Sequence, residues 1–513
     1  MGLRDDYAVF NKALSSLYED ETMVVAADEP PFKFNRELFD AAAEGVYENN
    51  GFDSRLMEGP RTKALMQETF RVLDTAVSSA LPHEVPTTIR YALENNAFVF
   101  SGFKTYHMLR EVGLSMLTEK GDIKPFGEFL MDVKRINTLY NQNYLYAEYN
   151  HAVGAAQMAA KWHDFEQDGD RYNLQYRTAG DDKVREEHAA LNGITLPPSA
   201  PFWEQFLPPN GWNCRCTTVQ VRKNKYPTSD PEEAMKRGLH CTEGVKNAIF
   251  RHNVGKSLEL FPPKHPYLKA PTKDKQVIER VTQEAIKEKR IQDMIDELPN
   301  SLTTDEKKAI AEHNLKLEEA LKITKGFRMS VEQADQQHAN PHYGESREYG
   351  INCQTCAPAY ALRLMGFDVT AKGNTKDSLS DYLSRQRSFE AWTNTDGTPA
   401  VPTLTHDWMV AKGYKQMSKE RYAEYFNKCT QETGVYILTI GWKCGGGHAT
   451  VLQRFDDGTL SYIEPQVYNE KIGTKRSIGE LCESGAIKPS SKRGILRVDN
   501  KLFNTKFASI FDK

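Results

Sequence analysis

Residues 176–221 read YRTAGDDKVREEHAALNGITLPPSAPFWEQFLPPNGWNCRCTTVQV, and this stretch organises the N-terminal half of a 513-residue chain. Two short β-like pieces, 172–178 and 217–221, flank a loop rich in proline and glycine. Upstream, apolar residues recur at helical spacing over 62–80 and 143–162, which predicts core helices. We therefore expect a mostly helical domain over 1–225, with 172–222 as its motif core.

Polar residues of the motif are spaced so that they can meet. Asp181, Arg185 and His188 stand at i, i+4 and i+7, which predicts a short helix with all three on one face. Cys214 and Cys216 alternate onto the same side of a predicted strand.

Two interpretations of this cluster remain open. Histidine and cysteine are usual zinc ligands, so His188, Cys214 and Cys216 could bind zinc, with Asp181 or His163 as a fourth ligand. The alternative, which we favour from sequence, is a buried polar network that fixes a loop-rich motif without a metal.

The motif resembles the head-morphogenesis domain of phage Mu F-type minor head proteins. This resemblance implies a minor capsid component in the virion, assembled near the portal, with phage portal and capsid proteins as partners; it implies no catalysis by this domain. It rests on matching residues in matching order: Arg177, Thr178, Asp181, Arg185, His188, Gly193, Trp203, Pro208, Pro209, Asn213, Cys214, Arg215 and Cys216.

Composition and charge exclude several classes of protein. Lys and Arg number 66 and Asp and Glu number 70, so no global basic field predicts a specific nucleic-acid or anionic-membrane partner. No apolar stretch reaches the roughly 18 residues of a membrane span. Eight cysteines are too few for a disulfide scaffold, and a reducing cytoplasm is the expected site of synthesis.

The rest of the chain divides by composition, which makes the expected fold α+β and multidomain. Residues 226–325 are expected to form a charged helical linker, in which Thr303 and Glu306 make a capping box. Residues 326–513 are expected to form an α+β domain. A helix is predicted at 357–365, ending at Gly366, and strands at 434–441, 448–455 and 459–463, the last two joined by a tight turn at 457–458.

This last domain carries the residue types of a thiol nucleophile. Cys353 and Cys356 stand at the start of the predicted helix, where free N–H groups and the helix dipole lower a thiol pKa. His448 follows three glycines and opens a strand, so it can act as the base. Glu464 or Gln466, one hairpin later, can orient the imidazole.

The order Cys, His, then acid or amide resembles that of the papain-fold toxin and deamidase group. The resemblance implies a papain-like domain in which Cys353 is the nucleophile, His448 the base and Glu464 the orienting group, with Cys356 as reserve nucleophile. The group usually has Asp in place of Glu464, and papain's oxyanion-hole glutamine is absent. Backbone N–H groups or the side chain of Gln354 are therefore the expected oxyanion donors.

The implied activity is hydrolysis of a protein amide, as a peptidase or a glutamine deamidase, without a metal or organic cofactor. The substrate would be a protein in the virion or the host cell. Three alternatives stay open. Cys353, Cys356, Cys444 and His448 form a C-x2-C…C-x3-H set that could bind zinc; the domain could be catalytically inactive and purely structural; or the chain could be a free bacterial toxin.

Overall fold

The computed structural model of the chain divides into two compact units, Met1–Glu288 and Lys289–Lys513. The predicted α+β, multidomain class is confirmed. The structure describes residues 3–19, 30–82, 85–118, 122–336, 338–468, 473–483 and 487–512.

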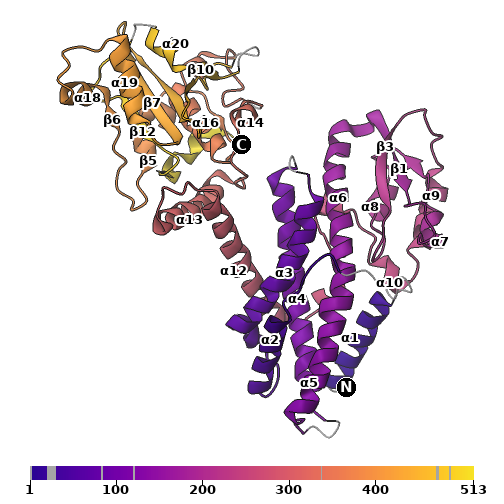
Figure 1. The fold of residues 1–513 in the computed structure, drawn as a ribbon. Coiled ribbons are helices and arrows are strands. Elements are labelled where there is room, and N and C mark those ends of the chain that lie inside the picture. The colour runs from indigo at the N-terminus through magenta and orange to yellow at the C-terminus, as the bar shows by residue number, and fades with distance from the viewer. Residues whose placement is uncertain are drawn as a thin grey trace. The chain divides into compact units, whose positions relative to one another are not determined.

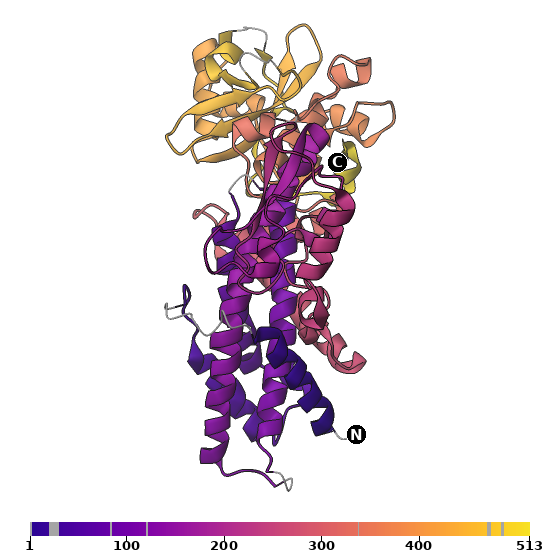
Figure 2. The same ribbon diagram turned by 90° about the vertical axis from the view of Figure 1, so that its right-hand side faces the viewer.

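Long helices build the core of the N-terminal unit, and α3, α4 and α6 run side by side (Figures 1 and 2). The helices predicted at 62–80 and 143–162 are confirmed as α3 and, after a π-helical turn η3, as α6. Small side chains on α6, including Ala152, Ala155 and Ala159, are almost fully buried, so neighbouring helices approach closely. The elements are α1 (Leu3–Tyr18), α2 (Arg36–Glu48), η2 (Ser54–Glu58), α3 (Pro60–Ala80), α4 (Thr87–Ser115), α5 (Phe126–Asn137), η3 (Thr138–Tyr144), α6 (Leu145–Asp168) and η4 (Gly169–Arg171).

A small antiparallel sheet of order β2-β1-β3 follows the helices. The two predicted strands are confirmed as β1 (Tyr172–Arg177) and β3 (Thr217–Arg222), paired from Tyr172↔Arg222 to Arg177↔Thr217. This register brings the two ends of the 178–216 loop together. The loop and the segment after β3 hold α7 (Glu186–Ala189), β2 (Thr195–Leu196), α8 (Phe202–Phe206), α9 (Pro231–Cys241), α10 (Gly244–Ala248), α11 (Val254–Ser257) and η5 (Pro266–Leu268).

The region 226–325, expected to be a linker, is shared between the two units. Helix α12 (Thr272–Asp296) buries Ile278 and Val281 in the N-terminal core. Helix α13 (Thr304–Leu321) begins with the predicted capping box and buries Leu317 and Leu321 in the C-terminal core. Apolar residues on one face of each charged helix therefore attach the region to the units on either side.

The C-terminal unit is built on an antiparallel sheet of order β10-β9-β8-β7-β12-β6, in which β11 also pairs with β7. Along β7, Val435 and Ile437 face the core that contains α16, whereas Tyr436 and Leu438 face a second core with α19. The sheet is therefore covered on both faces (Figure 1). Its strands are β6 (Thr403–Leu404), β7 (Gly434–Trp442), β8 (Gly447–Arg454), β9 (Leu460–Ile463), β10 (Lys475–Ser477), β11 (Ile487–Lys488) and β12 (Gly494–Arg497).

The three predicted strands are confirmed as β7, β8 and β9, and Gly458 turns the last hairpin with a positive φ of 81°. The helices are α14 (Val331–Asp335), α15 (Arg347–Gly350), α16 (Cys353–Leu364), α17 (Leu379–Ser384), η6 (Ser388–Ala391), α18 (Thr405–Ala411), α19 (Lys419–Cys429), α20 (Ile478–Glu483) and η7 (Thr505–Ile510). The pairs β4 (Thr370–Ala371) with β14 (Phe511–Asp512), and β5 (Trp392–Thr393) with β13 (Leu502–Phe503), form small separate sheets.

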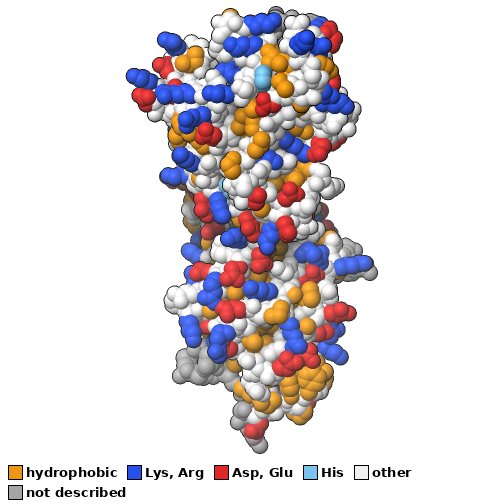
Figure 3. Space-filling view, turned by 90° about the vertical axis from the view of Figure 1, so that its left-hand side faces the viewer, with side chains coloured by type: hydrophobic (Ala, Val, Ile, Leu, Met, Phe, Trp, Pro, Cys, Tyr) orange, Lys and Arg blue, Asp and Glu red, His pale blue; other side chains and the backbone are white. Residues whose placement is uncertain are grey.

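The surface carries both signs of charge. On the face drawn in Figure 3, Lys and Arg side chains are interspersed with Asp and Glu side chains. Among the helices within the described ranges, none combines the length and the apolar character that crossing a bilayer requires.

Candidate functional site

The start of α16 places Cys353 at a helix N-terminus. The helix begins at Cys353, four residues before the predicted start, and Pro358 lies in its second turn. The first N–H groups of a helix have no partner within it and carry the positive end of its dipole. The thiol of Cys353 therefore lies where a negative charge is stabilised, and its residue retains 9% exposure.

His448 lies near the start of β8 and is paired with a carboxylate. Its Nε2 lies 2.7 Å from Oε2 of Glu464, just beyond the end of β9. The hydroxyl of Tyr462 donates to the same carboxylate oxygen at 2.5 Å, and the backbone N–H of Gln466 donates to Oε1 at 3.2 Å. The carboxylate is thus held in place, and Nδ1 of His448 remains available to the thiol.

The pKa of the imidazole is shifted by its burial and by the groups around it, which include the Cys353 thiol. Burial lowers the pKa of His448, but hydrogen bonds with Cys353 and Glu464 and their negative charges raise it to about 10. Burial raises the pKa of Glu464, whereas His448 and Tyr462 lower it to a net value below the usual range. The structure therefore brings together Cys353, His448 and Glu464, three of the predicted catalytic residues.

Gln466 has a different role from the predicted one of orienting His448. Its side chain donates to Oδ1 of Asn352 at 3.3 Å, and its carbonyl accepts from Nδ2 of Asn340 at 3.0 Å. Asn352 in turn donates to Oδ1 of Asn340 at 3.0 Å and to the carbonyl of Lys372 at 3.1 Å. This buried amide network fixes the residue directly before Cys353.

The two other predicted residues on α16 differ in exposure. Gln354 is half-buried, and Oε1 of its side chain accepts a hydrogen bond from the hydroxyl of Ser388, which leaves the amide nitrogen as a donor. Cys356 is fully buried, and burial raises the pKa of its thiol well above the ordinary value.

The alternative zinc set of this unit is not brought together. Cys444 is exposed in the β7–β8 turn, and in the described part of the chain it belongs to no cluster of three or more metal-ligating side chains. The β7–β8 hairpin carries Cys444 to an exposed turn, whereas Cys353 and Cys356 are buried with α16.

Arg493 is a site residue that the sequence did not indicate. Burial lowers the pKa of its guanidinium, while the nearby Cys353 thiol, when charged, raises it, and its Nη1 donates to the carbonyl of Ile440. A Cβ on Gly447 would lie 1.0 Å from this Nη1. The glycine before His448 is therefore needed to admit a cation beside the thiol.

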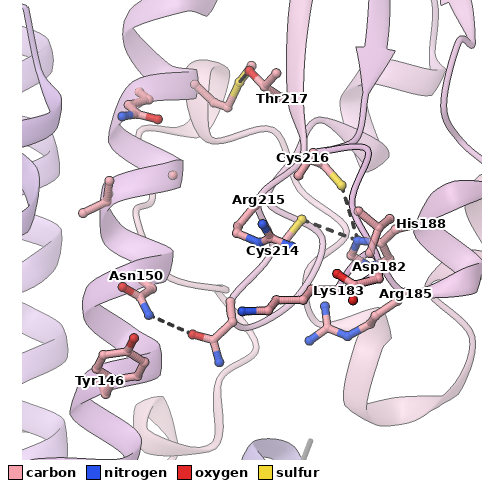
Figure 4. A pocket seen from close by; sticks show the side chains of 17 residues that line it. Tyr146, Asn150, Asp182, Lys183, Arg185, His188, Cys214, Arg215, Cys216 and Thr217 are labelled. Carbon is pink, nitrogen blue, oxygen red and sulfur yellow. Dashed lines mark hydrogen bonds between the residues drawn. The ribbon is translucent and has the colours of Figure 1, made fainter. Parts of the chain in front are cut away.

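A second cluster lies in the N-terminal unit, beside an open pocket of about 710 Å³. Figure 4 shows the sulfur atoms of Cys214 and Cys216 both directed at the imidazole of His188. The distances from Nδ1 of His188 are 3.5 Å to Sγ of Cys214 and 3.6 Å to Sγ of Cys216.

The prediction of one short helix that carries Asp181, Arg185 and His188 on the same face is wrong. Helix α7 begins only at Glu186, because Asp181 accepts the N–H of Lys183 in a turn and Arg185 is extended. Cys214 and Cys216 likewise lie in the extended segment before β3 rather than on a strand.

Neither candidate for a fourth ligand lies at this cluster. Asp181 pairs with Arg215 through contacts of 2.5 and 2.6 Å, and Nε2 of His163 lies 2.8 Å from the amide of Gln167. The sequence missed Cys241, the last residue of α9, whose thiol is near enough to His188 to help raise the pKa of the imidazole.

The thiols and imidazole of the cluster are strongly coupled. Burial lowers the pKa of His188, but hydrogen bonds and attraction from Cys214 and Cys241 raise it to about 10. A hydrogen bond from Cys216, opposed by burial and aided by His188, lowers the pKa of Cys214 well below its ordinary value.

Comparison with known proteins finds a family match within the N-terminal unit. Residues 126–219 match the family described as "Phage Mu protein F like protein", a range that includes His188, Cys214 and Cys216 but not Cys353 or His448. The chain is 29% identical over 177 residues to "Mu-like prophage FluMu F protein" of Haemophilus influenzae, covering 32% of this chain and 40% of the relative. It is 32% identical over 87 residues to "Putative capsid assembly protein F" of Escherichia phage Mu, covering 16% of this chain and 17% of the relative. The chain therefore spans less than half the length of either relative, and no solved structure gave a significant match.

Proposed function

We propose that this chain is a phage minor head protein, built into the capsid near the portal, and that its C-terminal unit is a cysteine hydrolase of protein amides. The Mu F-like domain at 126–219 supports the first part, together with the relative named for capsid assembly. The second part rests on one observation: the His448 imidazole is hydrogen-bonded to Glu464 and is close enough to the Cys353 thiol, at a helix N-terminus, for that thiol to raise its pKa.

The geometry supports a division of roles. His448 takes the thiol proton, and the α16 N-terminus and Arg493 stabilise the resulting thiolate. The thiolate attacks an amide carbonyl to form a thioester, and the imidazolium protonates the leaving amine or ammonia. Water then attacks the thioester, with His448 as general base, and regenerates the thiol.

Other residues would position these groups. Glu464 keeps the imidazole in the tautomer and orientation that face Cys353, while Tyr462 holds the carboxylate. The N–H of Cys353 and the amide nitrogen of Gln354 are donors for the oxyanion that develops on the substrate carbonyl. Cys353, which is partly exposed, suits the nucleophile better than Cys356, which is fully buried.

The hydrolase proposal is tested by iodoacetamide labelling of the full chain across pH, with each modified cysteine identified by peptide mass spectrometry. We expect Cys353 to label rapidly below pH 7, and His448→Ala to move its labelling midpoint toward about 8.5, the free-thiol value. The exposed Cys444 serves as an internal reference in both chains. If Cys353 is labelled slowly, and at the same rate in the His448→Ala chain, the hydrolase proposal is refuted and a structural head protein is left.

The head proposal has a separate test. Virions purified from the encoding phage or induced prophage should contain the chain, and particles with Cys353→Ala should contain the same amount. Absence of the chain from otherwise complete particles would refute incorporation, and would favour a free toxin if Cys353 were reactive.

A further inference from the structure

The cluster on the N-terminal unit has a geometry that a hydrogen-bond network does not explain. Two sulfur atoms converge on one nitrogen, Nδ1 of His188, at 3.5 and 3.6 Å. An imidazole nitrogen offers either one N–H or one lone pair, so it cannot make a good hydrogen bond with both sulfur atoms at once. A cation between the three atoms would satisfy all of them.

The distances match those of a tetrahedral zinc centre. With Zn–N of about 2.05 Å, Zn–S of about 2.3 Å and ligand angles of about 109°, bound nitrogen and sulfur atoms lie about 3.6 Å apart. The nitrogen and both sulfur atoms here also lie within 4.8 Å of one another. Among the described residues, this trio is the one group of three or more His, Cys, Asp or Glu ligands that meets such a spacing.

A fourth ligand comes from a separate element. Helix α9 packs against α7, and the last residue of α9, Cys241, is 3% exposed and lies close enough to His188 to help raise the pKa of its imidazole. Cys241 lies next to the trio rather than inside it, so its thiol completes the coordination by a small movement toward Cys214 and Cys216. In the structure as described, Cys214, Cys216 and Cys241 form no disulfide.

We propose that His188, Cys214, Cys216 and Cys241 bind one structural Zn²⁺. One His and three Cys are a ligand set typical of structural zinc, and four protein ligands close the coordination to substrate. The ion would tie the segment before β3 to α7 and α9. This region needs such a link, because α7 has four residues and β2 has two.

The charges around the cluster fit an anionic metal centre. Three thiolates and one Zn²⁺ carry a net charge of −1, and Arg215 lies between the two thiols in the chain. Its guanidinium interacts electrostatically with Cys214 and Cys216 while it pairs with Asp181.

The test is the zinc content of the full chain, purified without chelators and measured by mass spectrometry of the metal. We expect about one zinc per chain, lost in Cys216→Ser and in Cys241→Ser. The matched control Cys482→Ser changes a buried cysteine of the C-terminal unit and should retain the zinc. Replacement by Co²⁺ should give the visible bands and thiolate charge transfer of a tetrahedral thiolate site.

Unfolded variants would also lose metal, so the wild-type chain gives an independent measurement. Removal of zinc with a chelator should lower the melting temperature of the N-terminal unit, and added zinc should restore it. A metal-free wild-type chain that binds no Co²⁺, a disulfide between Cys214 and Cys216 in freshly reduced protein, or full zinc in Cys241→Ser would each overturn the four-ligand site. None of these outcomes depends on the reactivity of Cys353, so they do not test the hydrolase proposal.

Discussion

Glu464→Gln is the substitution that tests most directly whether a carboxylate raises the pKa of the His448 imidazole. The two side chains are only about 15% exposed, at 14% for His448 and 15% for Glu464, so water screens the pair weakly. At a charge separation of about 4 Å and an effective dielectric of about 20, the attraction is about 4 kcal/mol. At about 1.4 kcal/mol per pKa unit, its loss should lower the pKa of His448 by up to about three units.

The Cys353 thiol also raises the pKa of His448, so both chains to be compared carry Cys353→Ala. In that background Glu464 should hold the pKa above 6.5, and the added Glu464→Gln should bring it below 6.5, because only burial then acts on the imidazole. Glutamine keeps a hydrogen bond to Nε2, so the change reports charge rather than packing.

The assay is an NMR pH titration of imidazole nitrogens in the full chain. The chain has 13 histidines, and the signal of His448 is identified by its absence from a His448→Ala spectrum. Glu420→Gln, on the exposed start of α19, is the control and should leave the titration unchanged. If the two Cys353→Ala chains titrate at the same pH, the ion pair is absent in solution and the assigned role of Glu464 is wrong.

Three further outcomes are expected. Glu148→Ala leaves the fully buried ammonium of Lys104 without its carboxylate and should cost about 3–5 kcal/mol in urea unfolding of the N-terminal unit. Gly447→Ala should displace Arg493 and slow the labelling of Cys353 at neutral pH, as Arg493→Ala should, because a cation beside the thiolate is lost. In the wild-type chain, the raised imidazole pKa contributes stability that is complete below about pH 6.5 and is lost as the pH rises toward 10. The lowered pKa of the Glu464 carboxyl contributes stability that is lost below about pH 4.3. The urea concentration that unfolds the C-terminal unit should therefore be highest between about pH 4.3 and about pH 6.5.

Local patterns predicted elements whose residues are close in the chain. Strands β1 and β3 were predicted as separate β-like pieces, the β8–β9 hairpin follows from its turn residues, and α16 follows from the helical pattern that ends at Gly366. The motif 178–216 was harder, because its short turns are fixed by side-chain contacts such as that of Asp181 with Arg215 rather than by periodicity.

Contacts between residues that are far apart in the sequence could not be predicted from local sequence patterns. Tyr462 could have been found, since it lies two residues before Glu464 on one strand. Asn340 and Arg493 could not, because only the folded chain brings Asn340 to Gln466 and Arg493 to the Cys353 site. Cys241 was missed for the same reason, because its neighbour His188 lies on another helix.

The two clusters show how the same residue types acquire different chemistry. In the C-terminal unit one thiol at the start of a 12-residue helix faces an imidazole whose other nitrogen is held by a carboxylate, which is the arrangement of a nucleophile and its base. In the N-terminal unit two thiols converge on a single imidazole nitrogen, a third thiol is adjacent, and the short helix α7 supplies little dipole. A thiol is only a weak hydrogen-bond donor and acceptor, whereas a divalent cation would bind all four ligand atoms directly. Zinc removal should therefore destabilise the N-terminal unit without touching the reactivity of Cys353, and His448→Ala should do the reverse.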